Sequence, residues 1–281
     1  MKILFMGTPE FARVCLEALQ ESDHEIVAVF TQPDRPSGRG KKLTPPPVKV
    51  YAEERGIPVY QPEKINSPQW AITLADCHAD IFVVAAYGQI LSQRVLDIPK
   101  FGCVNVHASL LPKYRGAAPI QQAIFDGETL TGITIMQMDA GMDTGDMLLK
   151  REVEITQEDT GGNLHDKLCK IAPEALLTAL DQIKTATIKS QKQDETQATY
   201  AGMITKEMER LDMSRPPQDV VNHIRAYNPF PGTYTEIDGK KVKIWNAKVA
   251  DGKVDFLELT PPGGKKMSAE AYFRGQQNKG G

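Results

Sequence analysis

The sequence predicts a doubly wound, mostly parallel α/β sheet that is followed by a smaller β domain. A short apolar segment at residues 2–6 leads through a turn into an amphipathic helical pattern, and a second apolar segment follows at residues 25–31. Residues 80–86 (DIFVVAA) are expected to form a strand, because six successive apolar residues after Asp80 are typical of a strand buried on both faces. From residue 208 the pattern changes to alternating apolar and polar segments separated by Asp-Gly pairs. Strands that alternate with helices favour a parallel sheet, and alternating segments with tight turns favour antiparallel strands.

The elements of the front part follow from the same patterns. Thr8 is expected to cap the first helix, with Pro9 at its first position. Pro173 lies within the longest predicted helix and suggests a break or kink there. Further helices are expected at residues 47–55, 67–77, 118–125 and 163–188, and further strands at residues 59–60, 101–106, 131–138 and 147–155. Glycines and prolines in residues 33–49 exclude regular structure through most of that loop.

The predicted domains are residues 1–188, a linker at 189–207, and residues 208–281. The linker begins with a polar stretch without periodicity at residues 189–199. In the last domain, a helix is expected at residues 214–226 and strands at 233–237, 241–247 and 254–259, with hairpin turns at Asp238-Gly239 and Asp251-Gly252. A small β-barrel of the OB type is the expected form.

Composition and charge limit the class of protein to which this chain can belong. No apolar run in the 281 residues approaches the roughly 20 needed to span a bilayer, and the apolar start is too short for a signal peptide, so a cytoplasmic location is expected. The four cysteines lack metal-knuckle spacing, and no metal is expected. The net charge is −3, yet residues 209–281 carry 12 basic and 9 acidic side chains, which is compatible with contact to a phosphate backbone without requiring it. The first strand is followed by neither a G-x-G-x-x-G nor a Walker-type phosphate loop.

The segment with the strongest chemical content is NVHASLLPKYRG, residues 105–116. Asn105 and His107 are two residues apart on a predicted strand and therefore point to the same face. An imidazole can move a proton near neutral pH, and a carboxamide can donate a hydrogen bond to a developing oxyanion. A carboxylate of the later turn DAGMDTGD, residues 139–146, could complete the set, and spacing alone leaves Asp139, Asp143 and Asp146 open.

The two segments together resemble the signature of the folate-dependent formyltransferases. MKILFMGTPEFA at the start, PDRPSGRGKKLTPPPVK in the early loop and AYNPFPG near the end resemble the branch that formylates methionyl-tRNA. The resemblance implies a Rossmann-like, formyltransferase-type sheet with an OB-like domain. That domain looks trimmed here, because the family has more strand sequence between residues 243–249 and 265–275.

The resemblance also implies an activity. It implies transfer of a formyl group from 10-formyltetrahydrofolate to the α-amine of methionine on initiator tRNA, without a metal and by a monomer. It selects Asp143 from the three acids as the partner of Asn105 and His107. Folate contacts are expected from Ser109, Leu110, Leu111, Pro112, Ile90 and Leu91, although the last two could equally be core residues. Arg115 could be a substrate contact, or it could be a surface or ion-paired residue.

Contacts to tRNA are expected from the basic early loop. Arg39 matches the basic tip of the loop that reaches the acceptor arm in the tRNA formyltransferases, and Lys41 and Lys42 follow it. Two other functions stay open. The acceptor could be the amine of a nucleotide sugar or of glycinamide ribonucleotide, or the chain could be a folate- or RNA-binding module without catalysis.

Overall fold

The structure, a computed structural model, describes residues 1–37, 40 and 42–277. The chain forms two compact units. The first unit contains residues 1–115, 132–152 and 167–199, and the second contains residues 116–131, 153–166 and 200–281. The division into domains at 1–188, 189–207 and 208–281 stays a prediction.

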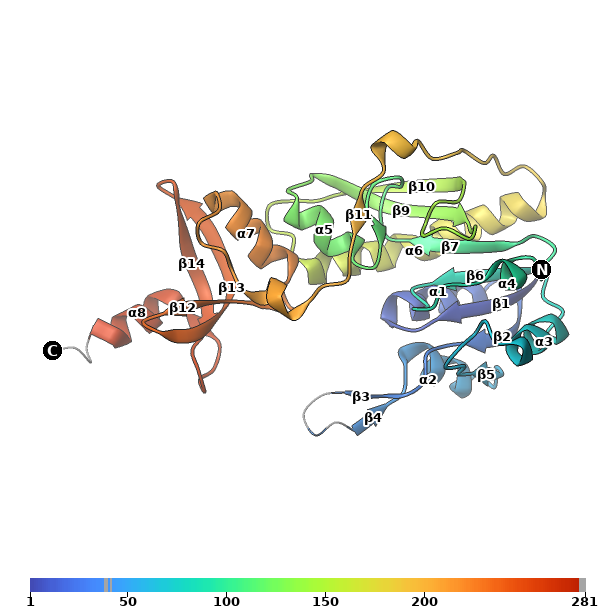
Figure 1. Cartoon of the computed structure of the whole chain (residues 1–281), viewed down its shortest axis with the longest axis horizontal. Coiled ribbons are helices and arrows are strands. Elements are labelled where there is room, and N and C mark those ends of the chain that lie inside the picture. The colour runs from blue at the N-terminus through green and yellow to red at the C-terminus, as the bar shows by residue number, and fades with distance from the viewer. Residues whose placement is uncertain (38–39, 41, 278–281) are drawn as a thin grey trace. The chain divides into compact units, whose positions relative to one another are not determined.

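A seven-stranded sheet forms the centre of the first unit (Figure 1). In sheet order its strands are β10 (Met147–Glu154), β9 (Leu130–Gln137), β7 (Cys103–His107), β6 (Ile81–Ala85), β1 (Lys2–Gly7), β2 (Glu25–Phe30) and β5 (Val59–Tyr60). The run from β7 to β5 is parallel, whereas β9 is antiparallel to β7. The chain passes from β1 outward to β2 and β5, and then returns to β6 on the other side of β1. The predicted doubly wound, mostly parallel sheet is confirmed.

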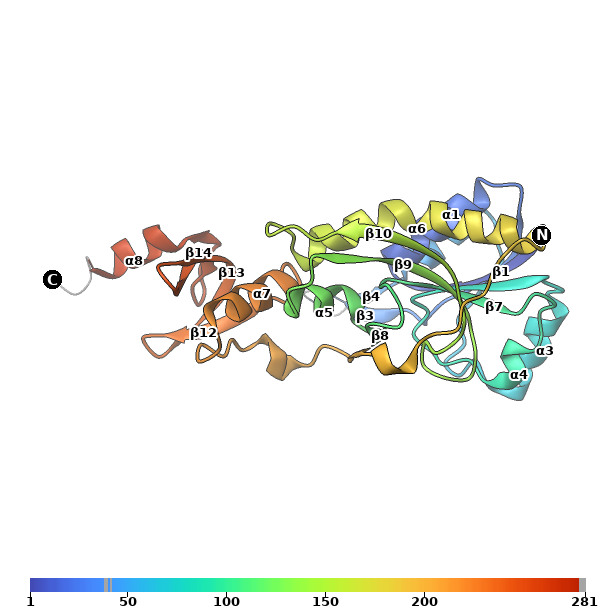
Figure 2. The same ribbon diagram turned by 90° about the horizontal axis from the view of Figure 1, so that it is seen from above.

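Helices cover both faces of this sheet. Figure 2 shows α1 (Glu10–Gln20) and α6 (Gly161–Lys184) on one face and α3 (Pro68–Asp76) and α4 (Gln93–Leu96) on the other. A further helix, α2 (Pro47–Glu54), packs against α1. Because both faces are covered, residues 3–7 of β1 and 81–85 of β6 are all buried, and these segments read as continuous apolar runs.

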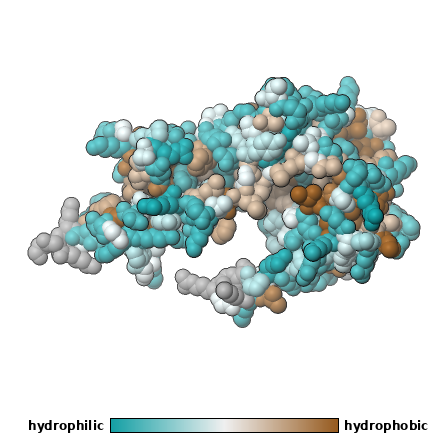
Figure 3. Space-filling model, viewed as in Figure 1, coloured by the Kyte–Doolittle hydropathy of each residue, from teal (hydrophilic) through white to brown (hydrophobic). Residues whose placement is uncertain are grey.

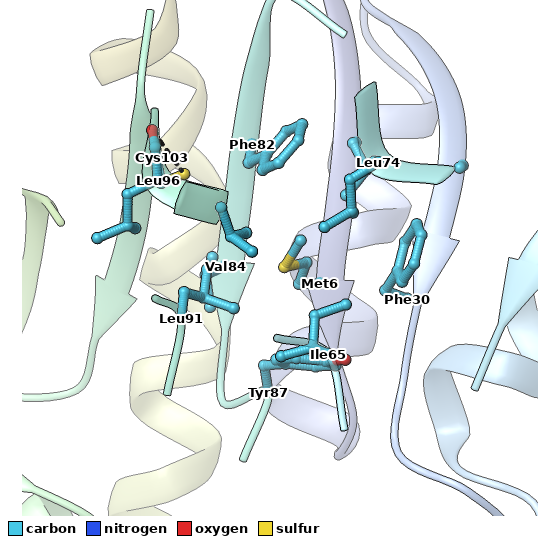
Figure 4. Close-up of a cluster of buried hydrophobic side chains, with 13 residues drawn as sticks. Met6, Phe30, Ile65, Leu74, Phe82, Val84, Tyr87, Leu91, Leu96 and Cys103 are labelled. Atoms are coloured by element: carbon cyan, nitrogen blue, oxygen red, sulfur yellow. Dashed lines mark hydrogen bonds between the residues drawn. The ribbon is translucent and has the colours of Figure 1, made fainter. Parts of the chain in front are cut away.

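The core beneath α3 and α4 is formed by side chains from one face of the sheet (Figure 4). Its strand residues include Met6, Phe30, Phe82 and Val84, and its helix residues include Leu74 and Leu96. Each of these side chains is at most 5% exposed. Burying such a side chain contributes about 1.5 to 3 kcal/mol, so this layer fixes the strands whose ends carry the polar residues described below.

Two local predictions in the first unit are wrong. Thr8 does not cap α1, whose N-cap is Pro9; instead the Thr8 hydroxyl donates to the carbonyl oxygen of Tyr87 at 3.0 Å. Residues 33–49 also contain more regular structure than expected, because β3 (Arg35–Ser37) and β4 (Lys42–Thr44) pair as antiparallel strands. The Thr8 hydroxyl is engaged by a residue that is distant in sequence, whereas β3 and β4 are near neighbours whose pairing outweighs the glycines and prolines around them.

The helix with the internal proline is continuous. α6 extends from Gly161 to Lys184 and contains Pro173, so Pro173 does not break the helix, while the predicted alternative of a kink stays a prediction. Apolar residues along α6, among them Leu164, Leu168 and Leu176, are fully buried. Their burial offsets the one backbone hydrogen bond that a proline removes. Along the described residues, none of the helices is both long and apolar enough to cross a membrane.

The second unit contains a small antiparallel sheet. Its strands, in sheet order, are β12 (Thr233–Ile237), β13 (Lys240–Ala250), β14 (Lys253–Thr260) and β15 (Met267–Ser268), and its helices are α5 (Pro119–Phe125), α7 (Pro217–Ala226) and α8 (Ala269–Gln277). Both Asp-Gly pairs adopt positive φ at each residue, as two-residue hairpins with the twist of the strands require. The predicted small β domain is confirmed. Among the described residues its sheet is open, with β12 and β15 at opposite edges, which agrees with a trimmed barrel.

Short elements complete the chain. They are the paired strands β8 (Arg115–Gly116) and β11 (Tyr200–Ala201) and the 3-10 helices η1 (Glu195–Gln197) and η2 (Lys206–Glu209).

A buried histidine in the second unit is expected to make its stability depend on pH. The ring of His223 is 7% exposed, packs against Phe125 and Tyr227, and has Nε2 2.7 Å from the carbonyl oxygen of Met208. Burial, helped by the charge of Arg215, lowers the pKa of His223, while the hydrogen bond to Met208 acts in the opposite direction.

We therefore expect acid to destabilise this unit. Below the ordinary histidine pKa of about 6.5 the unfolded chain binds a proton that the folded chain does not, so the free energy of unfolding falls as the pH drops from there towards the lowered pKa. Urea denaturation at about pH 7.5 and about pH 5.5 measures this loss, and His223→Gln should reduce it. An equal loss in wild type and variant would contradict the expectation.

Candidate active site

Strand β7 brings two polar side chains to its carboxyl end. Asn105 pairs with Val84 of β6 and Met136 of β9, so it sits between two neighbouring strands. Its side chain is half-buried, and His107 is 5% exposed. Because the two residues are separated by one position on a strand, they lie on the same face of the sheet. This placement follows the sequence-based prediction.

Asp143 reaches the same point from the turn between β9 and β10. Nδ2 of Asn105 donates to Oδ1 of Asp143 at 3.3 Å, and Nδ1 of His107 lies 3.6 Å from Oδ2 of the same carboxylate. Asp143 has φ of +53°, a left-handed conformation that is uncommon for residues other than glycine. The turn therefore holds Asp143 in a demanding backbone geometry while its carboxylate faces both side chains of β7.

The other two acids of the turn have different positions. Oδ1 of Asp139 accepts hydrogen bonds from the backbone N–H of Gly141 at 3.0 Å and the hydroxyl of Thr144 at 2.6 Å, so this carboxylate closes the turn on itself. The carbonyl oxygen of Asp146 accepts from the N–H of Gln137 at the end of β9 at 2.8 Å. The structure thus brings Asp143, and neither rival, to within ion-pair distance of His107.

The second ring nitrogen of His107 has its own partner. Nε2 lies 2.9 Å from the carbonyl oxygen of Tyr114. A carbonyl oxygen can only accept, so Nε2 carries a proton in this contact. Nδ1 faces the Asp143 carboxylate, which also only accepts when it is ionised. The doubly protonated imidazolium is therefore the form in which both contacts are attractive.

The turn after β7 is held from several sides. The hydroxyl of the fully buried Ser109 donates to the carbonyl oxygen of Lys113 at 2.7 Å, and the N–H of Leu111 donates to Oγ1 of Thr134 at 3.1 Å. Nζ of Lys150 donates to the carbonyl oxygen of Leu111 at 2.5 Å, and burial lowers the pKa of this lysine. The Ser109 hydroxyl is thus engaged within the turn.

The apolar residues predicted to contact folate divide into buried and accessible ones. Leu111 is fully buried against Met136 and Met147, and Leu91 is 2% exposed in the core beneath α3 and α4. Leu110 and Pro112 are half-buried, and Ile90 is 70% exposed. On the face of the molecule drawn in Figure 3, the most hydrophobic residues gather on the first unit. Ile90, Leu110 and Pro112 therefore have surface that a ligand can reach.

The predicted tRNA contacts are only partly within the described structure. Lys42 is exposed on β4. Arg39 and Lys41 lie outside the described residues. Within the described ranges, no group of three or more His, Cys, Asp and Glu side chains is arranged to hold a metal ion.

Sequence reasoning missed the role of the polar stretch 189–199. Arg115 is fully buried and forms an ion pair with Glu195, with Nη2 2.7 Å from Oε1 and Nη1 2.9 Å from Oε2. Its guanidinium also donates to Gln193. This contact shows Arg115 to be an ion-paired residue, one of the roles left open above. Nothing in a polar, aperiodic stretch marks such residues in advance.

Several solved structures share this fold. An N-formyltransferase from Helicobacter canadensis, in complex with folinic acid and dTDP-3-aminofucose, shares 18% identity over 95% of this chain and 98% of its own, with a TM-score of 0.69. A sugar N-formyltransferase from Shewanella sp. FDAARGOS_354 shares 21% identity over 89% of this chain and 99% of its own, with a TM-score of 0.65. A methionyl-tRNA formyltransferase from Clostridium thermocellum shares 16% identity over 96% of this chain and its own full length, with a TM-score of 0.63. These likenesses establish a common fold.

The family is given by two matching regions of the sequence. Residues 1–180 match the formyl transferase family, and residues 203–255 match the formyl transferase C-terminal domain. The chain belongs to the formyl transferase family. The family resemblance found in the sequence is confirmed at this level, and the acceptor of the formyl group is a matter for proposal.

Proposed function

We propose that this chain transfers the formyl group of 10-formyltetrahydrofolate to a primary amine, and that Asn105, His107 and Asp143 carry out the transfer. The observation that supports the roles most directly is the approach of Asp143 to both Asn105 and His107, at 3.3 Å and 3.6 Å. Folate as the formyl donor is supported by family membership and by the folinic acid bound to the enzyme from Helicobacter canadensis. The accessible surfaces of Ile90, Leu110 and Pro112 fit a partly apolar ligand.

The reaction needs a neutral attacking amine, a stabilised oxyanion and a proton for the departing folate nitrogen. The neutral amine attacks the formyl carbon and forms a C–N bond, while the carbonyl electrons move to the oxygen. The tetrahedral oxyanion then collapses, the bond from carbon to the folate N10 breaks, and N10 takes up a proton as the new amide nitrogen loses one. Asn105 would donate to the oxyanion, the charged ring of His107 would stabilise it, and Asp143 would hold His107 and relay the proton through water. No step needs a metal.

For the acceptor, we propose methionine esterified to initiator tRNA. The sequence blocks at the start, in the basic early loop and at residues 226–232 support this choice. In that function Arg39, Lys41 and Lys42 would contact the phosphate backbone of the tRNA. The basic residues of this loop suit a polyanion such as tRNA better than a small neutral amine.

The second candidate acceptor is an amino sugar attached to a nucleotide. The solved structures support it more than they support tRNA, because two of the three relatives described above are enzymes of this kind or were solved with such a ligand. All three are below 25% identical to this chain. They therefore support a shared fold that can bind such an acceptor, and they do not identify the acceptor of this chain. The amine of glycinamide ribonucleotide would need the same chemistry.

A direct assay distinguishes these acceptors. The protein is incubated with 10-formyltetrahydrofolate and either charged initiator methionyl-tRNA or a dTDP-amino sugar, and the formylated product is measured by mass spectrometry. We expect N-formylmethionine after hydrolysis of the tRNA and little product from the sugar. Product from the sugar alone would establish the second candidate. Folate binding without consumption of formyl groups under both conditions would instead indicate a binding module.

A further inference from the structure

The side chain of Gln193 lies between the two turns of the candidate site. Its Oε1 accepts from Nε and Nη2 of Arg115 at 3.0 and 2.8 Å. Its Nε2 donates to the carbonyl oxygens of Asp143 and Gly145, both at 2.7 Å. A carboxamide has two acceptor sites and two N–H donors, so all of its hydrogen-bonding capacity is used here.

On one side, Gln193 is connected to His107. It holds the guanidinium of Arg115, and the preceding carbonyl, that of Tyr114, accepts the hydrogen bond from Nε2 of His107. The same stretch of chain secures the Tyr114–Arg115 backbone, since Thr199 accepts from both N–H groups at 2.9 Å, through its hydroxyl for Tyr114 and its carbonyl oxygen for Arg115. The position of the His107 ring therefore depends on Gln193 and Thr199.

On the other side, Gln193 holds the turn that carries Asp143. This turn includes the left-handed residue Asp143 itself, whose backbone conformation is disfavoured without external support. The two short hydrogen bonds from Nε2 of Gln193 supply that support at the carbonyls of Asp143 and Gly145. The amide of Gln193 thus joins the side chain of Arg115, which follows the Nε2 partner of His107 in the chain, to the backbone of Asp143, whose carboxylate faces Nδ1.

We propose that Gln193 is a positioning residue for formyl transfer, which sets the distance between the carboxylate of Asp143 and the ring of His107. This inference rests on the proposed function. Gln193 has no contact with the reacting atoms in this role. It acts by keeping two turns, each from a different part of the chain, at a fixed separation.

Substitution of Gln193 tests the proposal. Gln193→Ala should lower kcat by about 10- to 100-fold, the loss expected from a displacement near 1 Å at the reacting groups. KM for the amine and for the folate should change little, and the pH profile of kcat should move, since the partner of His107 moves. Gln193→Glu keeps acceptors for Arg115 but faces two carbonyl oxygens with a carboxylate, so it should cause a similar loss even where the alanine variant folds poorly.

The matched control is Gln197→Ala. Gln197 belongs to the same stretch, is exposed, and donates to Oδ2 of Asp194 at 3.0 Å. This variant should keep the kcat, the pH profile and the melting temperature of the wild type. Gln193 acting only as a structural residue would lower the melting temperature of its variants while kcat and the pH profile of the folded enzyme stayed unchanged, and that outcome overturns the proposal.

A second measurement is independent of activity. The imidazole nitrogen resonances of His107, assigned by their loss in His107→Gln, are recorded in wild type, Gln193→Ala, Gln193→Glu and Gln197→Ala. We expect a shift of the His107 resonances and of their pH titration in the two Gln193 variants only. Unchanged resonances in both of these variants overturn the inference. If the wild-type protein transfers no formyl group, the proposed function is wrong. The resonances then still show whether Gln193 positions His107.

Discussion

Replacing His107 by alanine is expected to lower kcat for formyl transfer by on the order of 10²- to 10³-fold, as the loss of a well-placed oxyanion donor does. The ring is buried, its Nε2 is fixed by the carbonyl oxygen of Tyr114, and its Nδ1 faces Asp143. In the proposed mechanism, its removal would deprive the developing oxyanion of the positive charge of the imidazolium. Single-turnover rates measure the effect without interference from product release.

Two further variants make this prediction specific. Asp143→Asn keeps the shape of the side chain but removes the negative charge beside Nδ1, and should also lower the single-turnover rate. His165→Ala is the control, because His165 lies on α6 and interacts with the neighbouring Asp166. Thermal denaturation verifies that each variant is folded. A folded His107→Ala protein with the wild-type rate would remove His107 from the mechanism.

Gly145→Ala is expected to damage both stability and activity. A Cβ atom at this position would lie 1.8 Å from the carbonyl oxygen of Gln137, which is backbone of β9 and cannot turn aside. The turn that carries Asp143 would have to move away from the sheet. We expect a loss of about 1 to 3 kcal/mol in the free energy of unfolding, as for other overpacked sites, together with a large fall in kcat because the Asp143 carboxylate moves with the turn.

Urea denaturation and single-turnover kinetics measure the two effects of this change. Gly202→Ala provides the matched control, since a Cβ atom there meets nothing within 4 Å. It should change the free energy of unfolding by no more than about 0.5 kcal/mol. Equal stabilities and rates for the two variants would show that the turn at Gly145 tolerates a displacement that the static geometry forbids.

Much of the fold was predictable because its signals are local. Continuous apolar runs mark β1 and β6, which are buried on both faces, and Asp-Gly pairs mark the two hairpins of the second unit. The error at Thr8 arose where a distant partner outweighs local preference, and the error at β3 and β4 arose where the pairing of two nearby segments outweighs it. Thr8 donates to Tyr87 instead of capping its own helix. The strands at residues 35–37 and 42–44 pair despite the glycines and prolines around them.

In the candidate site, too, some features follow from the local sequence and others depend on tertiary contacts. By itself the sequence determined that Asn105 and His107 share one face at the end of a strand, since a strand alternates its side chains with a period of two. Spacing left three acids open and the family resemblance selected Asp143, which the tertiary structure places beside both residues. Only the tertiary structure decided where Arg115 is bound and that Gln193 joins the two turns. These contacts link turns far apart in the chain, and a turn's backbone angles and distant hydrogen bonds leave no periodic trace in a sequence.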